Sequence, residues 1–322
     1  KHELRDFNPL LPTNNLEIDR TSVTHLGPNK NLEVYDWPGG YAKRYNKEEG
    51  LNGVFTDRER SVQVRQEEIE VGYKQFYGSG NCSTLTSGYK FSLKEHPNTE
   101  NNADYVVLAA RHESPQTPTY ISDQPDMEGY KADFTALAFG TPYRPPRLTP
   151  RPVVYGAQTA FVVGPDGEEI FSDKFGRVKV QFHWDREGQM DQGSSCWLRV
   201  AQTWASNGWG SMSIPRIGME VLVNFLEGDP DQPIISGCVY NAQNMPPYTL
   251  PDEQSKSTMK SYSTKGGGGF NEFRIEDKKG SEQIFIHAEK DQDIRVKNDC
   301  KEIIKHDRHL IVENDQFEQV KK

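Results

Sequence analysis

Alternating apolar and polar residues in the middle of the chain limit its fold more than any other feature. In the segment 175–186, FGRVKVQFHWDR, Val178, Val180, Phe182 and Trp184 alternate with basic and polar residues. A period of two residues predicts a half-buried β-strand. We therefore expect these four side chains in the core of a β-domain.

Four further runs rich in β-branched or aromatic residues lie near this segment, at 159–164, 196–202, 220–229 and 233–241. Val221, Val223 and Phe225 alternate in the third run, and we place them in the same core. That run ends in EGDPDQP, whose aspartates are expected to accept hydrogen bonds from turn amides. Short strands separated by glycine and proline predict a small β-barrel or sandwich.

The end of the chain repeats every eight residues. An apolar or small residue recurs at Ala288, Val296, Ile304, Val312 and Val320, and an aspartate recurs at the same interval. A chain with one or two apolar residues per repeat cannot close a core alone, and it would leave strand edges unpaired. Three copies wound around one axis are the smallest closed solution. We therefore predict that Val296, Ile304, Val312 and Val320 face the axis of a homotrimer.

The first 144 residues combine short strands with one helix. Strand-like runs occur at 34–37, 89–93 and 105–114. Thr56 and Glu59 have the spacing of a capping box. Val62 and Ile69 follow at helical spacing, and the glycines from Gly78 are expected to end the helix.

Two proline-rich segments predict rigid connections between domains. The first, 141–152, holds five prolines in twelve residues, and its arginines could grip an adjacent acidic surface. The second is 245–251. The glycines at 266–269 lack a following GK[ST] and a helical pattern, so we interpret them as a turn between strands rather than a phosphate loop.

Composition makes several functions less favourable. The formal net charge is −9, which counts against a nucleic-acid partner. Four dispersed cysteines form no zinc-binding pattern and fit reduced thiols. No apolar run has the length of a transmembrane helix.

No arrangement of residues specifies an active site, so we predict no catalytic, cofactor or metal site. His306 and His309 near Asp307 could bind a metal between chains, but exposed polar side chains are the favoured interpretation. His183 and Asp185 could suggest acid–base chemistry, although an exposed or interface histidine is favoured.

A stacking platform for single-stranded nucleic acid could be formed by four tryptophans, Trp184, Trp197, Trp204 and Trp209. The acidic net charge makes packing in the core and between subunits the better interpretation.

Two long segments carry a resemblance to a known family. Residues 167–188 and 195–248, which include WASNGWG and IPRIGMEVLVNFLEGDPDQPIISGCVYN, resemble the OB-fold core of the VgrG family of type VI secretion spike proteins. The segments 34–41, 86–97 and 105–114 resemble the hub domain of that family, which is similar to the ring under the baseplate of contractile phage tails. The family's hub is larger than this region, so we expect the chain to enter it part-way through.

The resemblance implies a mainly β chain with minor α content. We expect part of a hub domain of the β-barrel type at 1–144, a proline-rich linker at 145–156 and a five-stranded OB-fold at 157–248. A connector and the first octads of an intertwined trimeric β-helix needle are expected at 249–322.

The function implied by the resemblance is mechanical. A homotrimeric spike would cap a secreted tube and carry effectors through a target membrane, after assembly in the bacterial cytoplasm and secretion through a contractile apparatus. The implied partners are an Hcp-type tube protein, baseplate proteins, a PAAR-type tip protein and effectors. Two alternatives stay open, namely a prophage contractile-tail spike and an OB-fold module that binds nucleic acid or glycan.

Overall fold

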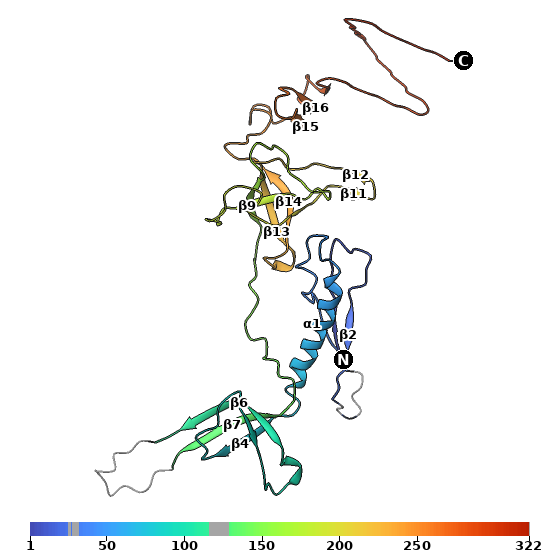
Figure 1. Ribbon diagram of the computed structural model, residues 1–322. Helices are drawn as coiled ribbons and strands as arrows, with labels where there is room; N and C mark the ends of the chain where they lie inside the picture. Colours follow the sequence, from blue (N-terminus) through green and yellow to red (C-terminus); the bar gives the residue numbers. More distant parts are fainter. Residues whose placement is uncertain (25–26, 28–31, 116–128, 322) are drawn as a thin grey trace. The chain divides into compact units, whose positions relative to one another are not determined.

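The computed structural model describes residues 1–24, 27, 32–115 and 129–321 (Figure 1). The chain forms two compact units, Lys1–Val239 and Tyr240–Lys322. Across these described ranges, no helix combines the length and apolar character needed to cross a membrane.

The N-terminal part of the first unit packs a helix against a small sheet. The sheet has the order β2-β1-β3, and its elements are β1 (His2–Leu4), β2 (Ile18–Arg20), β3 (Val34–Asp36) and the helix α1 (Gly53–Glu70). α1 contacts both β1 and β2. The buried core between them consists of Leu4, Leu16, Tyr41, Ala42, Val54 and Val62.

The helix begins earlier than the capping pattern predicts. Its N-cap is Asn52, which makes no side-chain cap hydrogen bond, so the predicted capping box at Thr56 and Glu59 is wrong. Backbone hydrogen bonds from Gly53 and Val54 to the preceding turn already start the helix there.

The helix also ends earlier than predicted. It stops at Glu70, and Gly78, the predicted terminator, lies inside strand β4. The C-cap residue Val71 is still buried, but Ile69 and Tyr73 are about half exposed, so the buried apolar face that would favour a longer helix ends here.

A curled sheet follows the helix, with strand order β4-β7-β6-β5. Its elements are β4 (Phe76–Gly80), β5 (Lys90–Ser92), the short helix η1 (Thr99–Asn101), β6 (Asp104–Glu113) and β7 (Lys131–Ala138). The strands predicted near 34–37, 89–93 and 105–114 are thus confirmed as β3, β5 and β6. Phe91 stacks on Tyr105 and meets Phe134 edge-on, which fixes the packing of this sheet.

The middle of the chain forms a closed five-stranded barrel. Its strand order is β10-β14-β13-β8-β9, and a bridge between Val178 and Leu198 joins the two ends. The elements are β8 (Gln158–Val163), β9 (Lys179–Phe182), β10 (Arg199–Val200), β13 (Glu220–Phe225), η2 (Leu226–Gly228) and β14 (Pro233–Val239). All five predicted strands therefore exist, although β9 and β10 are shorter than predicted.

The barrel core contains most of the side chains expected from the alternating pattern. Its fully buried members are Ala160, Val162, Val178, Val180, Leu198, Val221, Val223 and Ile235. Phe182 and Phe225 are partly buried and pack against this cluster.

Trp184 was also expected in the core, and that prediction is wrong because its side chain is 67% exposed. β9 ends at Phe182, whose carbonyl accepts a hydrogen bond from the Asp185 amide, so the chain turns before the alternation can continue. The indole stacks on the Phe182 ring at 5.2 Å, and its Nε1 donates to Gln158 Oε1 over 2.9 Å.

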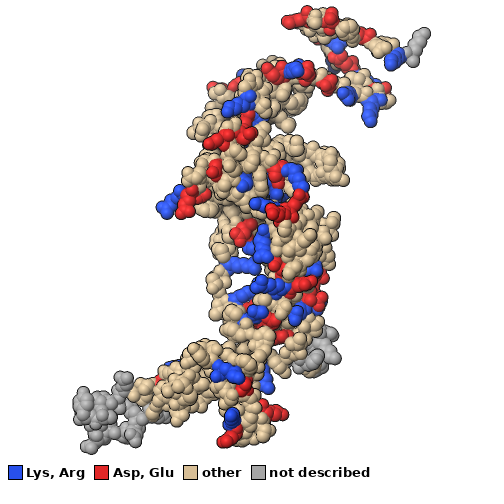
Figure 2. Space-filling view, viewed as in Figure 1, with Lys and Arg blue, Asp and Glu red and all other residues tan. Residues whose placement is uncertain are grey.

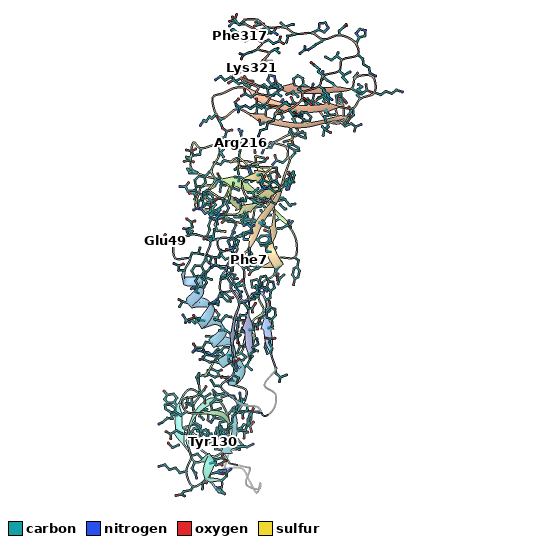
Figure 3. All side chains as sticks on the ribbon, turned by 90° about the vertical axis from the view of Figure 1, so that its right-hand side faces the viewer. Phe7, Glu49, Tyr130, Arg216, Phe317 and Lys321 are labelled. Atoms are coloured by element: carbon teal, nitrogen blue, oxygen red, sulfur yellow. The ribbon has the colours of Figure 1, made fainter. Side chains whose placement is uncertain are left out.

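The second unit contains an antiparallel sheet of β15 (Lys256–Tyr262), β16 (Phe270–Glu276) and β17 (Gln283–His287). The glycines 266–269 connect β15 to β16, which confirms the predicted turn between strands. The octads at 288–321 form no strand in the single chain. Figure 3 shows side chains projecting from this tail, where Phe317 is 92% exposed.

Candidate assembly surfaces

One face of the β15–β16–β17 sheet is apolar and open. The strand register places Met259, Phe273 and Ile286 in one row across the sheet, and Ile275 and Ile284 in the next row on the same face. Met259 is 76% exposed and Ile284 is 69% exposed. Alternation along each strand thus creates an apolar surface that the second unit of this chain does not cover.

The opposite face of this sheet is closed by the chain itself. The Tyr248 hydroxyl bonds to the Glu272 carboxylate, and Arg274 Nη1 donates to Tyr248 Oη over 2.8 Å. Thr258 Oγ1 donates to Glu272 Oε1 over 2.8 Å. Burial alone would raise the pKa of Glu272, but the Tyr248 and Thr258 hydroxyls hold that pKa below its usual value. The two faces are therefore chemically distinct, one polar and linked by side-chain hydrogen bonds, the other apolar and open.

The predicted axis residues are substantially exposed in the single chain, as are all residues from 289 to 321. Val296, Ile304 and Val312 are 51%, 44% and 46% exposed, and Val320 is 84% exposed. Ile303 and Ile311 add a second exposed apolar side chain to two octads. The orientation of the four axis residues in an assembly stays a prediction.

The apolar sheet face escaped the sequence analysis. Its signal was present, because Phe273 and Ile275, and then Ile284 and Ile286, are spaced two residues apart. Residues 249–322 were expected to form a connector and the first octads of a needle, and this face was not singled out.

The proline-rich segment 141–152 is held against α1 by ion pairs. Arg144 Nε lies 2.7 Å from Glu67 Oε2, and Arg147 Nε lies 3.1 Å from Glu68 Oε2. The prediction that arginines in this segment grip an acidic surface is confirmed for these two. Arg151 instead lines a small polar hollow beside Arg147.

The turn after β13 joins the barrel to the N-terminal part. Lys43 Nζ lies 2.9 Å from Asp229 Oδ2 and 3.1 Å from Asp231 Oδ2. Trp37 Nε1 donates to Glu227 Oε1 over 3.1 Å. Burial favours a higher pKa for Asp229, but the Asp231 amide and the Lys43 ammonium lower it overall. The Asp231 amide donates to Asp229 Oδ1 over 2.9 Å, which confirms the predicted role of an aspartate in this turn.

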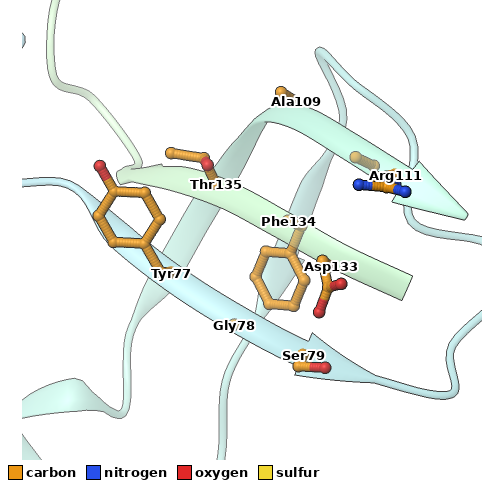
Figure 4. A pocket seen from close by; sticks show the side chains of 9 residues that line it. Tyr77, Gly78, Ser79, Ala109, Arg111, Asp133, Phe134 and Thr135 are labelled. Atoms are coloured by element: carbon orange, nitrogen blue, oxygen red, sulfur yellow. The ribbon is translucent and has the colours of Figure 1, made fainter. Parts of the chain in front are cut away.

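A hollow on the curled sheet offers no catalytic arrangement. Tyr77, Phe134 and Asp133 lie along it (Figure 4), and Phe134 fills the space left by Gly78, where a Cβ atom would lie 2.3 Å from the ring. Asp133 is paired with Lys131 at 3.1 Å. The carboxylate in the hollow is therefore already paired with a lysine. The ring of Phe134 fills the space beside Gly78.

The residues considered for chemistry do not come together. His183 Nε2 lies 2.8 Å from Thr159 Oγ1, whereas Asp185 accepts from the Glu187 and Gly188 amides. His306 pairs with Asp307 at 2.8 Å. Over the described ranges, no group of three or more histidine, cysteine, aspartate or glutamate side chains could hold a metal ion.

The four tryptophans take part in separate ring contacts rather than in one continuous stack. Trp184 stacks on Phe182, and Trp197 packs on Phe171 at 5.0 Å. Trp204 and Trp209 contact each other at 5.0 Å on a hairpin outside the barrel sheet.

Three family models match successive parts of the chain. Residues 1–117 match the phage tail baseplate hub, and residues 168–240 match the type VI secretion system and phage-baseplate injector OB domain. Residues 257–322 match the C-terminal trimerisation domain of bacteriophage T4 gp5. The barrel and the open sheet face thus fall in regions with OB-domain and trimerisation-domain character.

Curated relatives are similar along almost the whole chain. The type VI secretion system spike protein VgrG4b of Pseudomonas aeruginosa is 43% identical over 98% of this chain and 39% of its own length. The spike protein VgrG1b of the same organism is 44% identical over 95% of this chain and 40% of its own length. The actin cross-linking toxin VgrG1 of Vibrio cholerae is 41% identical over 87% of this chain and 24% of its own length.

The chain spans about two fifths of the spike proteins it matches. The hub, OB and trimerisation matches follow one another along the chain, and the similarity to the spike protein VgrG4b covers 98% of it. The chain therefore belongs to the VgrG family of type VI secretion spike proteins, which is related to the phage baseplate hub and spike.

Proposed function

We propose that this chain forms the central part of a homotrimeric spike, which caps a secreted tube and carries effectors across a target membrane. The observation that supports this most directly is the open apolar face of the β15–β16–β17 sheet within the region similar to a trimerisation domain. Other copies of the chain would remove that face from water. Burial of apolar surface contributes about 25 cal/mol per Å², so such a face is a strong drive for association.

The parts of the chain have separate roles in this proposal. Residues 1–144 form part of the hub, 145–156 the linker, 157–248 the OB-fold domain, and 249–322 the connector and the start of the needle. Val296, Ile304, Val312 and Val320 face the shared axis of the needle. The ion pair of Arg147 supports the linker role because it limits the freedom of the linker against α1, and the ion pair of Arg144 holds the residue just before the linker.

The proposed work of the chain is mechanical rather than catalytic. An Hcp-type tube protein and baseplate proteins meet the hub, and a PAAR-type tip protein and effectors meet the needle end. Contraction of the apparatus supplies the energy, after assembly in the bacterial cytoplasm. A toxin domain such as the one named for the Vibrio cholerae relative would be an addition to this spike.

The alternatives receive less support. Similarity to several curated secretion spikes favours the secretion system over a prophage tail. A barrel that binds nucleic acid or glycan needs aromatic or basic side chains gathered on one surface. Trp184 and Trp197 instead pack on different phenylalanines, which does not favour such a binding surface.

The test is the solution mass of the 322-residue chain, measured by light scattering after gel filtration. A trimer of the 36.7 kDa chain has a mass of about 110 kDa. The double variant Ile304→Asp/Val312→Asp should lower this mass, because two carboxylates per chain would be buried without partners.

The matched control is Lys305→Asp/Glu313→Asp, which changes the neighbouring exposed positions and should leave the mass unchanged. A wild-type mass of 36.7 kDa at every concentration would refute the homotrimer for this chain. A trimer that tolerates Ile304→Asp/Val312→Asp would refute only the axis assignment.

A further inference from the structure

A two-stranded hairpin with an aromatic surface stands apart from the barrel sheet. It consists of β11 (Ala205–Ser206) and β12 (Trp209–Gly210), which pair with each other and with no other described strand (Figure 1). Trp204 is 66% exposed and Trp209 is 56% exposed, and Met212 at the end of the hairpin is 82% exposed. These side chains do not contribute to the barrel core.

The hairpin lies in a segment without charge. From Val200 to Pro215 the sequence has no aspartate, glutamate, lysine, arginine or histidine, although 26% of the whole chain is charged. The surface near the β11 and β12 labels of Figure 1 is correspondingly tan in Figure 2. Tryptophan and methionine without neighbouring charge are typical of the centre of a protein–protein interface.

Polar groups of the hairpin are largely used within it. Gln202 and Ser213 exchange two hydrogen bonds, of 2.9 and 3.1 Å. The Ser211 amide donates to the Trp204 carbonyl over 2.8 Å, and the Ser211 hydroxyl lies 2.7 Å from Thr203 Oγ1. The two arms are thus tied together before any partner binds, which lowers the entropy cost of docking.

The backbone also fixes the aromatic pair. Gly210 has a φ of +136°, and a Cβ atom at this position would lie 2.3 Å from the Trp204 carbonyl oxygen. The indoles of Trp204 and Trp209 meet edge to face, with ring centroids 5.0 Å apart and planes at 88°. A rigid pair of exposed rings is a preformed binding element rather than a loose loop.

We propose that this hairpin docks on the barrel of a neighbouring copy of the same chain, so that the copies are joined at the level of the OB domain as well as along the needle. The inference rests on the homotrimer proposed above. The occupant is a second copy because the region similar to a trimerisation domain begins at residue 257, soon after the OB-domain match ends at residue 240. The residues between the two matches, 241–256, limit how far apart the barrels of joined copies can be.

The test uses a photo-reactive p-benzoylphenylalanine in the 322-residue chain. One variant carries it at Asn207 in the hairpin turn, where the left-handed backbone conformation falls on Gly208, so the replacement causes no backbone strain. The matched control carries it at Gln189, in an exposed and charged loop of the same barrel. Irradiation of the Asn207 variant should give covalent dimers and trimers at least tenfold above the control, with adducts mapping to residues 158–239 of another copy.

A second variant tests the energetics of docking. Ser206→Lys places a charge on the exposed hairpin, and Gln189→Lys places the same charge on the control loop. Ser206→Lys should raise the concentration at which half of the trimer dissociates at least tenfold, whereas Gln189→Lys should leave it unchanged.

The outcomes separate this inference from the proposed function. A trimeric mass without cross-links from Asn207 above the control overturns the hairpin contact and leaves the trimer intact. A monomeric mass overturns both. A trimer whose hairpin fails to cross-link, but whose tryptophan emission shifts with phosphatidylethanolamine–phosphatidylglycerol vesicles, would assign the hairpin to a lipid surface and overturn the protein contact.

Discussion

Glu272 is a buried carboxylate in the central strand of the β15–β16–β17 sheet, and it is only 5% exposed. Tyr248 and Thr258 stabilise its charged form through hydrogen bonds. Because the pKa of Glu272 is lowered in the folded chain, its contribution to stability is present above the ordinary glutamate pKa of about 4.3. That contribution is lost as the pH falls through the lower folded-state pKa.

We therefore expect acid to destabilise the second unit partly through this one residue. The melting temperature of Glu272→Gln should depend less on pH between 3 and 6 than that of the wild type, with a difference of about 2–4 °C at the ends of this range. Thermal unfolding at several pH values measures this, with the exposed residue change Asp252→Asn as the control. Identical pH profiles for the wild type and Glu272→Gln would show that the carboxylate network contributes nothing.

At the scale of elements, the apolar face of the sheet makes a prediction independent of the octads. Ile286 lies on that face, where it is paired with Phe273 of the neighbouring strand and is exposed to solvent. Ile286→Asp should weaken the trimer by about 3 kcal/mol or more per chain, since the carboxylate would be buried against other copies. Ser281→Asp adds the same charge in the exposed loop before β17 and should have no effect. Light scattering at decreasing concentration compares the two, and equal dissociation would argue that the face stays in water.

The helices and strands also show which parts of the fold can be predicted from local sequence patterns. The barrel strands were predictable because Val178, Val180, Val221 and Val223 alternate over short stretches, and alternation is a local property of a strand. Trp184 has the spacing of a further core residue, but a turn at Asp185 ends the strand before it, so its side chain does not enter the core.

Other features depend on groups far apart in the sequence. The contacts of Lys43 with Asp229 and Asp231 join positions more than 180 residues apart, so no local pattern reveals them. The hairpin tryptophans were predicted to serve packing rather than nucleic-acid stacking, but their isolation from the barrel follows only from the strand pairing. The start of α1 was missed because a preceding backbone turn, rather than a capping side chain, initiates it.

At the scale of the whole molecule, the proline-rich segment 141–152 acts together with the contacts of Lys43 and Trp37 to limit how freely the hub part and the barrel of the first unit can separate. Its ion pairs with Glu67 and Glu68 are partly exposed and should contribute roughly 1 kcal/mol together. The double variant Glu67→Gln/Glu68→Gln should therefore increase protease cleavage at 141–152 several-fold while the melting temperature changes little. Glu59→Gln, an exposed change on the same helix, is the control. High salt should reproduce the effect in the wild type, because it screens exposed pairs.

The sheet with one closed and one open face also sets an order of events in assembly. Its strands are joined by short loops within one chain, so they can pair before any other copy arrives. The octads have no described strand in the single chain, and in the proposed trimer they would become ordered only with neighbouring copies. Three preformed sheets would then meet first and align the chains, and the tail would zip up from residue 288 toward residue 321. In the proposed spike, the sheet would thus be the nucleus that sets the register of every later turn, and an alignment error made there would be copied along the entire needle.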